Sequence, residues 1–477
     1  MPALCHNFEE VDPHRIARYF RLGLCLGRWE NMRVLFRFLV LPYVFACTFC
    51  AATARGEAPS APTGETLTLD HALTIFHARS FDLHTAEAMV AGAEGDIVAA
   101  GQIENPIFTA SYTHVFNYRA DGKAPILGPC ITCAEGGPNF GINDSAALVH
   151  TLTGERGARV RVANAALRAA RLQKEDARRT LDFQLKSQYV QVLAAQEALR
   201  FDREIQAFSK RMTDIGRARH PGNIDDGQLA RLEADGLRAD LTVTAAEVAL
   251  DGEMAALAFL LDTRDPMTTY TLDDGTFHFR VPPRLATAKL DPLVEEAFVR
   301  RPDLHVSQAL IDQAAGSVSI AKYQQIPDVQ LFMLYVEQGT AQNTATPPML
   351  TAGVQFPLPL FYQQQGEIHK AESNLNVQRA TYDKATAQVI EDVRTALVGF
   401  TGARHIAEVM EGALLEKSKR GRDVAEIQFR EGSIALVDLL DAERQYTAVT
   451  QEYVQDLLNY WNSVFALEQA VGEDLRN

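Results

Sequence analysis

Long stretches of the chain are rich in Ala, Glu, Gln, Arg and Leu and contain no proline, a pattern that predicts long helices. One such helix is expected from about Gly366 to Phe429, a length of about 95 Å at 1.5 Å per residue. A return helix is expected from Ile434 to Val471. Helices of this length without a globular core need neighbours along their sides, so the pattern predicts coiled-coil packing.

Shorter stretches place apolar residues at every second position, which is typical of strands with one apolar and one polar face. In the second half of the chain, strands are predicted at Asp328 to Gln338 and at Leu350 to Phe356, and the alternation is clear in the second of these. In the first half, a weaker form of the pattern predicts strands at Ile107 to Phe116 and at Ala147 to Leu152. One face of each strand suits lipid and the other suits water.

The same succession of motifs occurs twice. Asp82 to His84 recurs as Asp303 to His305, and Gly222 to Ile224 recurs in similar form as Gly432 to Ile434. The separation along the chain between matching residues is about 12 residues shorter after the strands than before them. The first copy therefore carries a longer loop between its strands. The chain is therefore predicted to contain two copies of one unit, each with a helix, a β-hairpin and a long helical hairpin.

This duplication predicts four parts: an N-terminal extension and signal peptide at 1–54, a first repeat at 66–261, a linker at 262–291 and a second repeat at 292–472. Beyond the signal, no apolar stretch reaches the roughly 20 residues of a membrane helix, so only strands of a closed barrel could hold the mature chain in a membrane. Four strands per chain are too few to close a barrel, whereas three chains would supply twelve.

The N-terminal extension has the features of a secretory signal. Arg33 and Arg37 precede an apolar run at 38–50, and the small residues Ala52 to Ala54 then predict cleavage near Arg55. The apolar run has about 13 residues, too few to span a bilayer comfortably as a helix.

Processing and cysteine chemistry leave alternatives open. Met32 is a candidate start, and lipidation at Cys47 is a less favoured alternative because the bulky Phe45 fits poorly before such a site. After cleavage the remaining cysteines are Cys130 and Cys133, in the long loop of the first copy. Export to an oxidising compartment favours a disulfide between them, and half of a metal site is the alternative.

Composition narrows the function classes. The chain has 477 residues, 47% of them hydrophobic, which suits a large ordered structure. A formal net charge of -15 argues against a nucleic-acid binder, because such proteins need clustered cationic side chains. We find no phosphate-binding loop, nucleophile elbow or zinc-hydrolase motif, so neither enzymatic activity nor a cofactor is expected.

The duplicated unit, with Arg301 to Leu304, Phe356 to Phe361 and Gly432 to Asp441 in this order, resembles TolC-like outer-membrane factors over residues 66–472. The helix start at Gly366 is similar to the corresponding helix start in the heavy-metal branch of that family. The resemblance implies a mainly α fold with a membrane β-barrel: a homotrimer with a twelve-stranded barrel in outer-membrane lipid, continued by a helical coiled-coil barrel through the periplasm. The linker would form an equatorial domain.

The same resemblance implies a passive exit duct of a tripartite efflux system. An inner-membrane transporter, of the RND type or another, would drive cargo through a periplasmic adaptor into the duct, and metal cations are the leading cargo hypothesis. Two alternatives remain: a type I protein-secretion exit channel, and a periplasmic coiled-coil adaptor or structural protein that conducts nothing.

Two aspartates are the main candidate site residues. Asp438 and Asp441 are three residues apart, so a helix places them on one face. The resemblance implies that they form rings of three carboxylates at a periplasmic gate, where such rings favour cations. The alternative is an ordinary solvated helix face. The first copy carries Gln228 where the second has Asp438, so one such helix per protomer is expected.

The two helical turns are the other candidate site. The resemblance implies that the turns at Gly222 and Gly432, with Arg430, contact the adaptor. A plain glycine helix stop is compatible with this interpretation. Arg231 and Arg444 lie near these turns and could form ion pairs there.

Overall fold

The computed structural model describes residues 66–114, 123–124, 128–129, 136–220, 222, 224–263, 270–272, 277–337, 340–341, 344–345 and 347–476. They belong to one compact unit, Thr63–Asn477. The predicted signal peptide, Cys47, Cys130 and Cys133 lie outside the described residues.

The first half of the described chain runs through a helix pair, two strands, a short helix and two long helices. These elements are α3 (Leu69–Arg79), α4 (Phe81–Gly101), β2 (Ile107–His114), β5 (Gly136–Asn143), α5 (Ala147–Thr153), α6 (Glu155–Arg219) and α7 (Asp226–Leu260). Side-chain caps fix the first two helices. The Thr68 hydroxyl accepts from the His71 N–H, and the Ser80 hydroxyl accepts from the Leu83 N–H.

The second half follows a similar order. Its elements are α8 (Leu290–Arg300), α9 (Pro302–Tyr323), β7 (Gln330–Val336), β10 (Met349–Gln355), α10 (Gln365–Val409), a π-helical segment (Met410–Leu414), α11 (Leu415–Glu431) and α12 (Leu436–Val471). Pro302 is the first residue of α9, where its missing N–H costs no hydrogen bond. The two strands and the return helix lie close to their predicted bounds.

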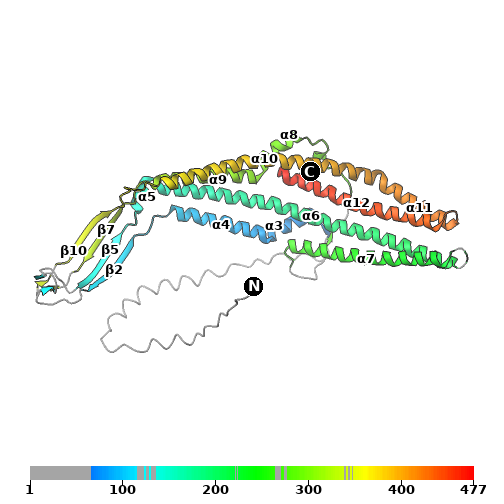
Figure 1. Cartoon of the computed structure of the whole chain (residues 1–477), viewed down its shortest axis with the longest axis horizontal. Coiled ribbons are helices and arrows are strands. Elements are labelled where there is room, and N and C mark those ends of the chain that lie inside the picture. Colours follow the sequence, from blue (N-terminus) through cyan, green and yellow to red (C-terminus); the bar gives the residue numbers. More distant parts are fainter. Residues whose placement is uncertain are drawn as a thin grey trace, which may run out of the picture. The chain divides into compact units, whose positions relative to one another are not determined.

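One antiparallel sheet joins the two halves. Its strand order is β10-β7-β5-β2, and β5 pairs with β7 from Asn139↔Val336 to Asn143↔Phe332. Two short antiparallel ribbons accompany it, β3 (Lys123–Ala124) with β4 (Gly128–Pro129) and β8 (Thr340–Ala341) with β9 (Thr344–Ala345). Figure 1 shows the four longer strands at one end of the unit and the α6–α7 and α11–α12 turns at the other.

The second strand predicted in the first half is wrong. Residues 147–152 form most of α5, and the strand that pairs with β2 is Gly136–Asn143, upstream of the predicted position. Ser145 and Ala146 adopt positive φ between the two elements, which turns the chain out of the sheet before the alternating residues begin. The true strand contains three glycines and a proline and carries no clear alternation.

The long helices pack along their sides, as predicted. Helix α6 contacts α4, α7, α9 and α12, and α12 also contacts α10 and α11 (Figure 1). In α12 the buried side chains recur in the three-and-four spacing of a coiled coil. Among the described residues, no helix combines the length and the apolar character that crossing a membrane would need.

The helix predicted as continuous from Gly366 to Phe429 is interrupted by the π-helical segment. Within it, Glu411 accepts hydrogen bonds from the Phe279 N–H at 2.9 Å and from the Tyr453 hydroxyl at 3.2 Å. The wider turn therefore coincides with the place where the chain between the two halves meets the helices.

The segment between the two halves packs against the middle of the helices. Its strand β6 (Thr271–Leu272) pairs in parallel with β1 (Thr66–Leu67), at the start of the described chain. The buried Tyr460 of α12 donates to the Arg280 carbonyl at 2.6 Å. Arg284 contacts Glu473 near the C-terminal end at 3.5 Å.

Candidate functional site

Each helical turn is closed by local hydrogen bonds. Helix α11 ends at Gly432, whose φ of 80° lies in the left-handed region that favours glycine, and the Ser433 N–H donates to the Gln428 carbonyl. Helix α7 begins with a capping box between Asp225 and Gln228.

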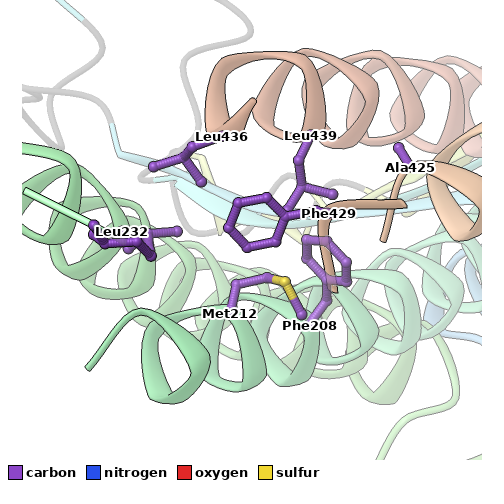
Figure 2. Close-up of a cluster of buried hydrophobic side chains, with 8 residues drawn as sticks. Phe208, Met212, Leu232, Ala425, Phe429, Leu436 and Leu439 are labelled. Atoms are coloured by element: carbon purple, nitrogen blue, oxygen red, sulfur yellow. The ribbon is translucent and has the colours of Figure 1, made fainter. Parts of the chain in front are cut away.

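A cluster of buried apolar side chains holds the two turns together, and we call it the tip cluster. It joins residues of α6, α7, α11 and α12 around two phenylalanine rings, as Figure 2 shows. Its members are Phe208, Met212, Ile224, Leu232, Ala425, Phe429, Leu436 and Leu439. Because all four helices contribute, neither turn can move far without disturbing the packing of the other.

Arg219 is a second connection between the turns. Its guanidinium donates to the Phe429 carbonyl at 3.1 Å and to the Arg430 carbonyl at 2.6 Å. It also lies 5.3 Å from the centroid of the Phe429 ring. These are carbonyls at the C-terminal end of α11, where a cation is favoured by the helix dipole. No local sequence pattern indicates this contact, because the partners are far apart in the chain.

Asp438 and Asp441 lie on an exposed face at the start of α12. The Asp438 carboxylate accepts from the Ala435 N–H at 3.2 Å, so it also caps the helix. Asp441 is 3.4 Å from Arg444 Nη1, and both side chains are about two-thirds exposed. Such an exposed pair contributes little to stability, so the carboxylate stays accessible to ions.

The other predicted residues are dispersed around the turns. Arg430 is exposed, and its carbonyl is held by Arg219. Gly222 and Gly432 are both exposed. Of the arginines considered for ion pairs, Arg444 contacts Asp441 as described.

Sequence reasoning missed a buried ionic cluster behind the tip cluster. Arg422, 5% exposed, lies 3.0 Å from Glu204, 2.8 Å from Asp423 and 4.0 Å from the centroid of the Tyr446 ring. The Tyr446 hydroxyl donates to Glu204 at 3.3 Å. Burial, with the negative charge of Glu204, raises the pKa of Tyr446 to about 12.

Glu443 is the unusual member of this region. It is 8% exposed, and neither of its carboxylate oxygens has a hydrogen-bond partner among the described residues. Burial raises its pKa from 4.5 to about 7, against the opposing effect of Arg422. The sequence held a signal that could have found it: Glu443 falls between Leu439 and Tyr446 in the coiled-coil spacing of α12, at a position that is normally apolar.

Comparisons with known proteins agree with this fold. Residues 293–473 match the model of the family described as outer membrane efflux protein. The cobalt-zinc-cadmium resistance protein CzcC of Cupriavidus metallidurans is 23% identical over 415 residues, which cover 85% of this chain and 90% of that protein.

Solved outer-membrane channels have the same fold. The CmeC channel of Campylobacter jejuni superposes with a TM-score of 0.69 at 18% identity, covering 85% of each chain. The outer-membrane channel OprN gives a TM-score of 0.68 at 17% identity, covering 86% of this chain and 91% of that one.

The helical bundle, the four-stranded sheet at one end and the paired turns at the other match the fold of these solved outer-membrane channels. Residues 293–473 match the outer membrane efflux protein family, and the predicted resemblance to TolC-like factors is confirmed.

Proposed function

We propose that the protein is the exit duct of a tripartite efflux system, through which cargo leaves the cell without crossing the periplasm freely. It resides in the outer membrane and extends into the periplasm. Transport energy is supplied elsewhere, by an inner-membrane transporter that reaches the duct through a periplasmic adaptor. The observation that carries this proposal is the combination of a strand end and a helical-turn end in one unit.

The sheet is the part proposed to enter the membrane. Apolar side chains project from it into solvent, among them Phe108, Tyr112, Leu350 and Val354. Within the described residues, β2 and β10 each pair with one strand and leave an open edge. Open edges with exposed apolar side chains favour pairing with further copies of the chain, and three copies would close a twelve-stranded barrel. The similar order of elements in the two halves supports the proposed repeat.

The turn end is proposed to contain the gate and the adaptor contact. In a trimer, Asp438 and Asp441 would each contribute three carboxylates, and a narrow ring of carboxylates attracts cations and repels anions. Their exposure in the protomer supports this role. The turns around Gly222 and Gly432, with Arg430, are exposed beside the gate residues and are proposed to meet the adaptor.

Metal cations are the proposed cargo. The relative CzcC is named for cobalt, zinc and cadmium resistance, and an acidic entrance suits divalent ions. Removing the protein from its host should raise cellular cobalt, zinc or cadmium under metal stress. Unchanged metal content with raised accumulation of an organic compound would redirect the cargo assignment.

The gate is tested by the ion selectivity of the purified protein in planar bilayers under a salt gradient. The parent should give a cation-selective reversal potential, and Asp438→Asn with Asp441→Asn should move that potential toward zero, because the ring loses its charge. The control replaces two exposed aspartates outside the turns, Asp251→Asn with Asp383→Asn. Equal selectivity in the gate variant and the parent would remove these aspartates from the gate while leaving the channel in place.

A further inference from the structure

A cavity of about 330 Å³ lies between α6, α7 and α12, beside the tip cluster. Part of its wall is apolar and includes Phe208, Met212 and Leu232. Glu443 also lines the cavity, as do the partly buried Asp202 and Asp235. The cavity therefore combines an apolar surface with a buried acid and two further carboxylates.

None of the described cations around this cavity hydrogen-bonds Glu443. Arg422 is the strongest positive influence on its carboxylate, but the Arg422 Nη2 is paired with Glu204 and Asp423, and its Nη1 does not hydrogen-bond Glu443. Arg238 and Arg444 line the cavity with exposed side chains, and Arg444 is paired with Asp441. Arg211 lies further off and is itself within 3.9 Å of Glu426. The carboxylate is left buried beside an open space without a donor.

An unpartnered buried carboxylate is unfavourable for folding, because the charge loses its hydration and gains no hydrogen bond in return. A glutamine or an apolar residue would suit this coiled-coil position better. Groups that break the local rules of packing in this way, next to a cavity, are typical of binding sites.

We propose that this cavity binds an organic cation with an apolar body, whose ammonium group donates to Glu443 while its aromatic or alkyl part packs against Phe208, Met212 and Leu232. An ammonium supplies both the charge and the donors that the carboxylate lacks. A bare metal ion fits less well, since no three potential ligand side chains are grouped for one within the described ranges. The site lies in the helical wall and does not depend on the gate or on conduction.

The test uses the full-length protein in detergent and benzylammonium as the probe, with benzyl alcohol as its neutral counterpart, in ligand-observed NMR titrations at pH 8. The parent should bind benzylammonium more tightly than benzyl alcohol. Glu443→Gln should weaken benzylammonium binding by at least about tenfold, the size of one lost charge-assisted hydrogen bond. Lowering the pH to 6 should also weaken binding to the parent, because Glu443 then takes up a proton.

The matched control is Glu452→Gln, the same substitution at an exposed position of α12, which should bind like the parent. Thr242→Leu fills part of the cavity from α7 without removing any charge and should also weaken binding. The proposal would be overturned if the parent bound the amine and the alcohol equally. It would also be overturned if the amine affinity were unchanged in folded Glu443→Gln or in Thr242→Leu.

Discussion

Replacing Glu443 with glutamine should stabilise the protein at high pH. The ordinary pKa of 4.5 applies to the unfolded chain, whereas burial raises the folded value to about 7. Below pH 4.5 the carboxyl is protonated in both states and carries no penalty. Between 4.5 and 7 the unfolded chain releases its proton while the folded protein retains it, so stability falls as pH rises, and the loss is complete above 7.

The size of this penalty follows from the two pKa values. At 1.36 kcal/mol per pH unit, the difference between 4.5 and about 7 corresponds to about 3 kcal/mol. Glutamine is neutral at every pH and has nearly the same shape. Glu443→Gln should therefore be more stable than the parent by about 1 to 3 kcal/mol at pH 8.5 and nearly equal to it at pH 4.5.

The assay is the apparent thermal midpoint of the helical circular-dichroism signal, at one fixed scan rate because large membrane assemblies often unfold irreversibly. Glu452→Gln serves again as the exposed control and should not change the difference between the two pH values. A Glu443→Gln variant that melts no higher than the parent at pH 8.5, or gains equally at both pH values, would refute the reasoning.

Two further predictions concern contacts that tie helices together. Arg219→Ala should speed amide hydrogen exchange around Gly432, because the carbonyls at the end of α11 lose their cation. Arg217→Ala removes an exposed arginine that is paired with Glu233 and should not change this exchange. Equal exchange in both variants would argue against Arg219 as a link between the turns. Lys186→Met should lower stability by about 2 kcal/mol, since Lys186 lies 2.6 Å from Glu468 in a buried pair and the carboxylate keeps Arg476, at 3.5 Å, as its remaining cation. Adding Glu468→Leu should restore part of the loss in thermal melts, and no recovery in the double variant would mean that packing rather than the buried charge causes the loss.

The elements with strong periodicity were predictable from the sequence. Helix α12 and strands β7 and β10 lie within about two residues of their expected bounds. Coiled-coil spacing persists along α12, alternation persists along β10, and β7 is a continuous apolar run of strand length. Strand β5 was not predicted because its glycines and proline give no alternation of apolar and polar residues. It is held in the sheet by backbone pairing with β2 and β7. The alternation in 147–152 was misleading since α5 is too short for a helical period to stand out.

The candidate site was only partly predictable. The shared exposed face of Asp438 and Asp441 follows from their spacing alone. The contact of Arg219 with the end of α11 depends on how two distant turns pack, which no local pattern encodes. Glu443 was predictable in part. Its place in the coiled-coil spacing is visible in the sequence, but its missing hydrogen-bond partner and the neighbouring cavity are visible only once the helices are packed.

The most direct test of the central claim is the conductance of the purified full-length protein added to a planar lipid bilayer. An outer-membrane exit duct should insert and give discrete, repeated current steps. Protein that stays water-soluble after signal removal and produces no steps at any salt concentration would contradict the account and favour a coiled-coil protein of the periplasm.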